Sequence, residues 1–149
     1  MVSFLVWADQ LTKVAIRATL APAQSRPVIP SLLHLTYVQN TGAAFGLFRG
    51  HPGIFVCFSL VVAIWLIVEL LKSPRRAGML TVGLVLILSG AVGNLLDRWR
   101  FGYVVDFIDV RVWPVFNLAD SMITCGVALL ILTQTGWLRR RRKRPASSR

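Results

Sequence analysis

The chain has 149 residues, of which 55% are hydrophobic and only 15% are charged. A soluble domain of this length exposes more charge, so the composition argues against a soluble protein and predicts one membrane-embedded domain over residues 1–149. The formal net charge is +11. Because the basic residues cluster at the ends of apolar segments, anionic lipid headgroups are favoured over nucleic acid as their partner.

The first apolar segment, at about residues 2–20, carries Asp9, Lys13 and Arg17. Asp9 and Lys13 are four residues apart, so a helix places them on one face, where they can pair. An uninterrupted span takes about 20 apolar residues. Two alternatives stay open: a spanning helix with a functional polar face, or a helix whose first part is missing because the start codon is misassigned.

The segment at 21–53 is too polar to span a membrane and is expected to form a loop with some local structure. Three prolines come first, and residues 32–40 (LLHLTYVQN) then alternate well enough to predict a short strand. Residues 41–50 (TGAAFGLFRG) are rich in glycine, which indicates a turn or a close approach of backbone.

Three further apolar segments predict spanning helices at about residues 54–71, 79–97 and 116–136. The segment at 79–97 contains small residues that permit close helix packing in lipid. These are Gly83, Ser89, Gly90, Ala91 and Gly93. Cys57 and Cys125 each lie inside an apolar run and are interpreted as small buried apolar residues.

Four spans place both termini on the same side of a membrane. Basic residues follow the second span and fill the tail at 137–149. Because positive charge marks the cytoplasmic side of a membrane protein, we expect both termini in the cytoplasm. The two longer loops, at about 21–53 and 98–115, then face outward.

The stretch 93–120 holds four of the six acidic residues of the chain. These are Asp97, Asp106, Asp109 and Asp120. Carboxylates are costly next to lipid, so their concentration here indicates a functional site. Asp97 and Asp109 have an arginine nearby and are interpreted as pairing groups, whereas the other two lie in apolar company and are the better candidates for chemistry.

Helical spacing groups the polar residues of this stretch. Asn94, Asp97 and Arg98 fall on one face of a helix, and Asn117 and Asp120 share a face of the next. All of them lie where helices meet the outer surface. The sequence therefore predicts a compact site at the outer membrane interface, built from two helix ends and the loop between them.

The residue types available narrow the chemistry of that site. There is no credible Ser–His pair, no cysteine beside a histidine and no phosphate loop, and His34 and His51 lack metal-ligand spacing. We therefore predict neither a metal nor another cofactor. Two carboxylates held close cannot both ionise easily, so one keeps a proton near neutral pH and can polarise a carbonyl while the other activates water. Asp106 and Asp120 are the candidates for such an aspartic-protease pair.

Five motifs, in this order and across nearly the whole chain, resemble those of the lipoprotein signal peptidases, the bacterial signal peptidase II family. They are ADQLTK at 8–13, QNTGAAFG at 39–46, GAVGNLLDR at 90–98, VVDFID at 104–109 and FNLADSMITCG at 116–126. One such motif alone would be a weak signal, but five in order are specific. Two departures are that only seven residues precede the first motif, and that the stretch from Asp109 to Phe116 is short.

The resemblance implies a fold of four transmembrane helices with a small extracytoplasmic β-cradle and a short surface helix, in the bacterial cytoplasmic membrane. It implies an aspartic endopeptidase that cleaves prolipoproteins just before a diacylglyceryl-modified cysteine. The expected partners are therefore the lipid-modified substrate and membrane lipids, and a globomycin-like inhibitor is expected to occupy the same site.

The resemblance also implies roles for single residues. Asp106 and Asp120 match the catalytic aspartates of the family. The residues that match substrate-binding or supporting positions are Asn40, Asn94, Asp97, Arg98 and Asn117. Asp9 and Lys13 match a polar pair of the first helix, for which a structural role is expected.

Two rival functions belong to other classes. A small proton-coupled transporter or channel would use the carboxylates as a proton relay and would carry polar residues along a path through the membrane. A structural or assembly subunit would use the aspartates only as pairing groups and would tolerate their replacement by asparagine.

Overall fold

The computed structural model describes residues 1–42, 52–72 and 78–135. The helices are α1 (Val2–Thr19), α2 (Pro52–Lys72), α3 (Gly78–Phe101) and α4 (Leu118–Gln134), and the strands are β1 (Ser25–Ile29), β2 (Leu33–Asn40) and β3 (Val104–Asp109). The tail predicted at 137–149 and most of the glycine-rich stretch lie outside the described residues. Among the described elements there is no separate short surface helix.

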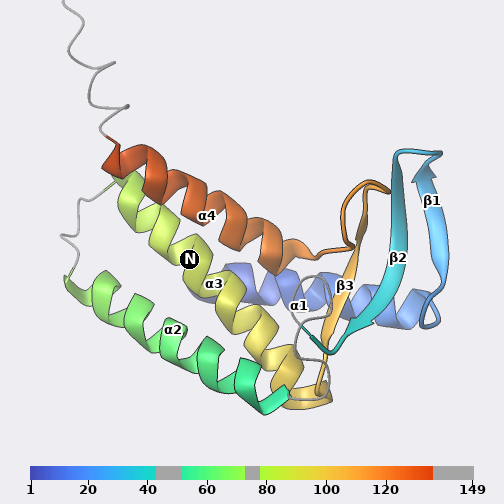
Figure 1. The fold of residues 1–149 in the computed structure, drawn as a ribbon, viewed down its shortest axis with the longest axis horizontal. Helices are drawn as coiled ribbons and strands as arrows, with labels where there is room; N and C mark the ends of the chain where they lie inside the picture. Colours follow the sequence, from blue (N-terminus) through green and yellow to red (C-terminus); the bar gives the residue numbers. More distant parts are fainter. Residues whose placement is uncertain (43–51, 73–77, 136–149) are drawn as a thin grey trace, which may run out of the picture.

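Helix α3 lies at the centre of the helical bundle. It runs between α2 and α4 and also contacts α1, and the three-stranded sheet lies at one end of the bundle (Figure 1). Helices α1 and α3 end at the sheet and α4 begins there. This arrangement brings helix ends together, as the sequence predicts for the site, and places one face of the sheet beside them.

The four apolar segments form four helices close to the predicted bounds. Helix α3 continues one turn further, to Phe101, whereas α4 begins at Leu118 because Phe116 forms a β-bridge with Ile108 and Asn117 is the N-cap. By length and composition, α3 is the one helix in the described part of the chain that could cross a membrane, and α4 is a shorter apolar helix.

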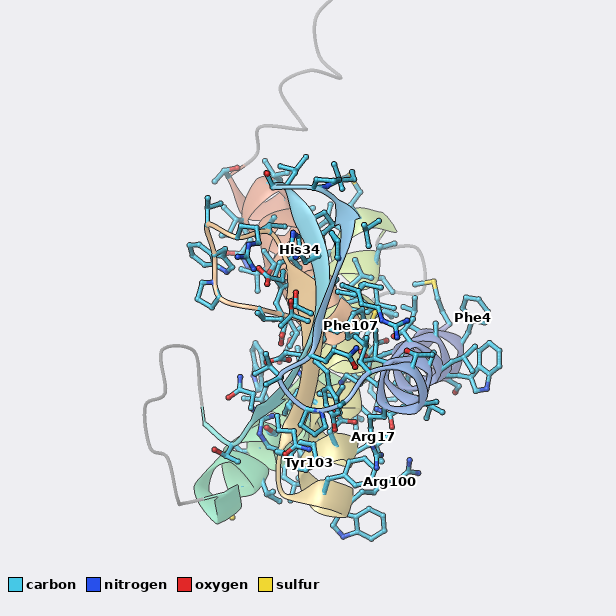
Figure 2. The ribbon with its side chains drawn as sticks, turned by 90° about the vertical axis from the view of Figure 1, so that its right-hand side faces the viewer. Phe4, Arg17, His34, Arg100, Tyr103 and Phe107 are labelled. Atoms are coloured by element: carbon cyan, nitrogen blue, oxygen red, sulfur yellow. The ribbon has the colours of Figure 1, made fainter. Side chains whose placement is uncertain are left out.

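Helix α1 buries charged side chains and exposes apolar ones, which is the reverse of an amphipathic helix in a soluble protein. Its charged residues Asp9 and Lys13 are buried, while a stripe at helical spacing is exposed. That stripe consists of Phe4, Trp7, Leu11 and Val14. Figure 2 shows Phe4 projecting from α1 away from the rest of the molecule. Large exposed apolar surfaces of this kind are typical of contact with a membrane.

The two cysteines lie on similar outward surfaces. Both Cys57 and Cys125 are free and exposed. The prediction that they are buried is therefore wrong, because an apolar run in a helix does not distinguish the face that packs against protein from the face that is left outside.

The sheet has one more strand than the sequence indicated in this region. Strand β2 confirms the strand predicted at 32–40, and β1 pairs with it in antiparallel orientation. Strand β1 is exposed along its whole length and contains Pro27, which a sheet tolerates at an edge because that position needs no N–H donor. Proline and exposure together hide the period-two pattern that identifies a strand.

Strand β3 pairs with β2 and is buried on both faces. Its Val105 and Phe107 pack with Ile16, Leu20 and Tyr37 in a cluster that joins the sheet to the end of α1. Side chains alternate along a strand, so Asp106 points to the opposite face, toward α3 and α4. The packing of β3 against α1 thereby aims the Asp106 carboxyl at the helix ends.

Small residues let the helices approach each other closely, as the sequence predicts for α3. At Gly90, a Cβ atom would overlap the carbonyl oxygen of Ala119 in α4. At Gly93, it would lie 2.6 Å from an oxygen of the Asp9 carboxylate in α1. Any larger side chain at these positions would separate the helices that carry the polar groups.

Candidate active site

Asp106 and Asp120 reach the same place from two different elements. Asp106 is the middle of β3 and only 2% exposed, while Asp120 lies half-buried in the first turn of α4. Asn117 caps α4: its side-chain oxygen accepts the N–H of Asp120 at 2.9 Å, and the Asp120 carboxylate accepts the N–H of Asn117 at 3.3 Å. This capping box fixes the Asp120 side chain at the helix N-terminus.

Side-chain amides connect the two carboxyl groups. Asn117 donates to one oxygen of Asp106 at 2.7 Å and to the amide oxygen of Asn94 at 3.1 Å. Asn94 in turn donates to Asp120 at 2.8 Å. From β2, Asn40 donates to the second oxygen of Asp106 at 2.9 Å. The three predicted asparagines therefore all donate hydrogen bonds to the candidate pair.

A buried ion cluster adjoins this network in the bundle. The Lys13 ammonium lies 2.9 Å from Asp9 on its own helix and 2.9 Å from Asp97 on α3. It also donates to the Asn94 oxygen at 3.0 Å. The predicted pairing of Asp9 with Lys13 is confirmed, and Asp97 joins the same cation from another helix.

Asp97 also ties β3 to the bundle. Its carboxylate accepts the Val105 N–H at 3.0 Å and the Gln10 amide at 2.9 Å. The sequence suggested Arg98 as the partner of Asp97. The half-buried Arg98 guanidinium interacts electrostatically most strongly with Asp120, then with Asp106 and then with Asp97. Its positive charge therefore acts on the whole carboxyl cluster and not on Asp97 alone.

Burial gives Asp106 an unusual proton affinity. Removal from water raises the pKa of its carboxyl to about 7, and the negative charge of Asp120 acts in the same direction. The hydrogen bonds from Asn40 and Asn117 oppose this shift without cancelling it. Near neutral pH, Asp106 is therefore a carboxyl group that can hold a proton or release it.

Asp109 lies at the other end of β3, among different partners. It pairs with Arg111 at 3.2 Å and accepts a hydrogen bond from the Thr36 hydroxyl at 2.8 Å. The Thr36 hydrogen bond, with help from Arg111, holds the pKa of Asp109 below its ordinary value. Asp109 is thus a pairing group, as the sequence indicated.

Comparison with known proteins identifies the family. A family model described as signal peptidase (SPase) II matches residues 1–135. The chain belongs to the signal peptidase II family. It is 47% identical over 132 residues to the lipoprotein signal peptidase of Halothermothrix orenii, a match that covers 89% of this chain and 90% of that one. It is 50% identical over 131 residues to that of Moorella thermoacetica, with 87% of each chain covered.

A solved structure supports the same assignment. A bacterial membrane enzyme, determined by the in meso method at 2.3 Å resolution, superposes with a TM-score of 0.84 at 34% identity, covering 99% of this chain and 90% of that one. As a member of the signal peptidase II family, the protein is a membrane aspartic peptidase that removes signal peptides from prolipoproteins. Membership decides against the transporter and assembly-subunit alternatives.

The sequence indicated most residues of the polar cluster in this signal peptidase II family member, but it did not indicate some of the hydrogen-bond donors. Gln10 donates to Asp97 and also to the Gly93 carbonyl at 3.2 Å. The Ala119 backbone N–H donates to Asp9 at 3.0 Å. Gln10 lies inside the first motif, which is the only signal that could have singled it out, and the backbone donor has no sequence signal.

Proposed function

We propose that Asp106 and Asp120 form the catalytic dyad of an aspartic endopeptidase that cleaves prolipoproteins just before a diacylglyceryl-modified cysteine. The observation that carries the proposal is the linkage of two carboxyl groups, on β3 and on α4, by the amides of Asn117 and Asn94. Each carboxyl is oriented by neutral donors, so the pair can share one proton and work on a water molecule between them.

The environments of the two carboxyl groups suggest different roles. Asp106 is almost fully buried, with a pKa raised to about 7, so we assign it the proton in the resting enzyme. Asp120 is less buried and accepts backbone hydrogen bonding at the N-terminus of α4, a position that favours negative charge. We therefore assign Asp120 as general base and Asp106 as general acid.

The reaction then follows with atoms and protons in balance. The Asp120 carboxylate takes a proton from water while the water oxygen attacks the scissile carbonyl carbon, and Asp106 gives its proton to the carbonyl oxygen. The product of this step is a tetrahedral gem-diol. When it collapses, the carbon–nitrogen bond breaks, Asp120 protonates the leaving nitrogen, and a gem-diol hydroxyl returns its proton to Asp106.

The remaining predicted residues support this pair. Asn40, Asn94 and Asn117 orient the carboxyl groups and limit their rotation. Asp97 holds the start of β3 through the Val105 N–H, and Arg98 supplies positive charge that limits repulsion within the cluster. Neither contribution needs a metal or another cofactor.

The membrane presents the substrate to this site. We propose that all four helices cross the bacterial cytoplasmic membrane with both termini in the cytoplasm, so that the sheet and the dyad lie near the extracytoplasmic face. The exposed apolar faces of the helices support this arrangement, because they can contact lipid and the acyl chains of the substrate. A globomycin-like inhibitor would then compete for the dyad.

The test is processing of a purified prolipoprotein by the purified protein in detergent or lipid vesicles. We expect cleavage of the diacylglyceryl-modified precursor, with the new N-terminus at the modified cysteine, and little cleavage of the same precursor without lipid. Asp106→Asn and Asp120→Asn are expected to abolish turnover. Absence of cleavage by the wild-type protein, or cleavage at another bond, would contradict the proposal.

A further inference from the structure

Lys13 is buried in the helical bundle, yet its contacts extend beyond a helix-to-helix ion pair. The side chain is 2% exposed, and an ammonium group has three protons to donate. Two of its contacts are the carboxylates of Asp9 and Asp97. The third is the side-chain oxygen of Asn94, a neutral group that in turn contacts Asp120.

The ammonium, together with the Asn117 amide that donates to the same oxygen, fixes which way the Asn94 amide faces. A lysine can only donate, so the Asn94 atom beside it must be the oxygen. The Asn94 NH2 group is then directed at Asp120, to which it donates at 2.8 Å. With the amide reversed, its NH2 would face the ammonium and its oxygen would face a carboxylate, and both contacts would be repulsive.

The other two amides of the site are oriented by backbone groups. The Asn117 oxygen accepts the N–H of Asp120, and the Asn40 oxygen accepts the N–H of Gly42 at 3.0 Å. Each of these amides is thereby held with its NH2 toward Asp106. For Asn94, two side chains donate to the oxygen: Asn117 at 3.1 Å and Lys13 at 3.0 Å. Lys13 is the charged one of the two, and mutation can remove it without touching the amides.

Asp9 and Asp97 have hydrogen-bond donors besides Lys13. Asp9 accepts the N–H of Ala119, and Asp97 accepts the N–H of Val105 and the amide of Gln10. If the cation served only to neutralise these two carboxylates, its third proton would not need to reach the amide that contacts the dyad. The contact with Asn94 is therefore the feature that connects the ion cluster to the chemistry.

We propose that Lys13 is a positioning residue for peptide-bond hydrolysis: it holds Asn94 so that the Asn94 amide orients the Asp120 carboxylate. This inference rests on the proposed function of Asp106 and Asp120. It gives Lys13 a role in turnover in addition to the structural role expected from its pairing with Asp9.

Lys13 also contributes charge near the dyad. Its positive charge lowers the pKa of Asp106, against the larger effects of burial and of Asp120. Within the part of the chain that the structure describes, the other charged groups next to this network are Asp9 on α1 and Asp97 and Arg98 on α3. The effect of Lys13 on the geometry of Asn94 can be separated from its effect on charge. Asp9, Lys13 and Asp97 together carry one net negative charge, so removing Lys13 together with the charge of one aspartate leaves the net charge unchanged.

The decisive variant is Lys13→Met combined with Asp9→Asn. It leaves Asp97 as the one charge of the three, so the net charge stays at minus one, while the Asn94 oxygen loses the ammonium and keeps Asn117 as a donor. In the prolipoprotein assay we expect kcat to fall about tenfold to a hundredfold, as for loss of one oriented hydrogen bond to a charged group, with KM within about twofold. The alkaline limb of the pH profile, which reports Asp106, should stay near its wild-type position, because Asn40 and Asn117 still donate to Asp106 and the net charge is unchanged.

Lys13→Met alone changes geometry and charge together. Loss of the cation should lower kcat and also move the alkaline limb to higher pH, because the positive charge of Lys13 lowers the pKa of Asp106. Lys13→Arg keeps the charge and several donors, so its alkaline limb should stay at the wild-type position and its kcat should exceed that of the double variant. This substitution also leaves the charge of the buried cluster unchanged, so it can be measured even if Lys13→Met does not fold.

Leu66→Ala is the control for general destabilisation. Leu66 is fully buried among apolar residues of α2 and α3, away from the polar network. Its truncation should lower thermal stability while kcat and the alkaline pH limb of the folded protein stay unchanged. Wild-type kcat in the folded double variant, or an equal loss of kcat in Leu66→Ala, would overturn the positioning role.

The same assay separates this inference from the proposed function. If the wild type does not cleave the lipidated precursor, or Asp106→Asn remains active, the proposed function fails. If the wild type cleaves, both aspartate variants are inactive and the Lys13 variants match the wild type, only the positioning role fails.

Discussion

Two pairs of carboxyl groups lie side by side in this protein and have different partners. Asp9 and Asp97 share the Lys13 ammonium, at 2.9 Å from each. Asp106 and Asp120 are instead joined by the amides of two asparagines. Both pairs bring an acidic residue from one element to an acidic residue of another, so proximity alone does not distinguish them.

The partner determines what each pair can do. The Lys13 ammonium offsets one of the two negative charges beside it and ties α1 to α3. A neutral amide donates a hydrogen bond without cancelling the charge, so repulsion between Asp106 and Asp120 persists and favours retention of a proton. The first pair is therefore a structural connection, and the second is prepared for proton transfer.

The largest expected effect is on the second pair. Asp106→Asn and Asp120→Asn should each lower kcat/KM for the lipidated precursor by at least about a thousandfold, because an amide can neither take a proton from water nor give one to the carbonyl. Single-turnover cleavage by protein with a cooperative thermal transition measures this. Asp109→Asn is the matched control on the same strand and should remain active.

A mutation in the first pair, Asp9 and Asp97, should change the stability of the protein. Asp97→Asn removes one anion from Lys13 and weakens the contact with the Val105 N–H. Breaking a buried ion pair costs about 3–5 kcal/mol, so the apparent Tm in detergent should fall by about 10 °C. At a temperature where the variant is folded, cleavage should be reduced far less than in the dyad variants. A loss of activity as large as theirs, without a fall in Tm, would remove the distinction between the two pairs.

The pH profile should report the proton on Asp106. Above about pH 7 this carboxyl ionises, so kcat/KM should decline on the alkaline side with a midpoint near that value. Asn40→Ala removes a hydrogen bond that lowers the pKa of Asp106, so the alkaline midpoint should move to higher pH, by roughly one unit. Gln39→Ala, at the neighbouring exposed position of β2, should not move it.

The smallest effect is expected at the outer end of β3. Asp109 has a lowered pKa, so its ion pair stabilises the protein above the ordinary aspartate range, and that stabilisation is lost as the pH falls through the native pKa. Because Arg111 is half-exposed, Asp109→Asn should lower the free energy of unfolding by about 1 kcal/mol or less at neutral pH. Thermal unfolding at neutral and acidic pH would show whether the difference disappears in acid.

Local patterns in the sequence predicted what depends on neighbours in the chain. Helical spacing grouped Asn117 with Asp120 and paired Asp9 with Lys13, and both groupings occur in the structure. Local patterns could not predict which side chains on different helices pair with each other. Asp97 has Arg98 as its neighbour in sequence, but Lys13 reaches it from a helix more than eighty residues away.

Strand β1 and the cysteines illustrate the same limit. An exposed edge strand with a proline has no alternating apolar pattern, and an apolar helix has no periodic signal for the face that lies outside the bundle. The motifs shared with the signal peptidase II family indicated Asn40 as part of the site. Periodicity could not, because β2 carries it to Asp106 through strand pairing.

The central claim is that Asp106 carries a proton near neutral pH, held by amides in a pair with Asp120. Infrared difference spectroscopy from about pH 5 to about pH 9 can detect the protonated carboxyl directly, by comparing the wild type with Asp106→Asn. We predict a protonated-carboxyl band that disappears with a midpoint near pH 7 and is missing from Asp106→Asn but present in Asp109→Asn. A band that titrates in the ordinary aspartate range, or one that survives in Asp106→Asn, would contradict the account.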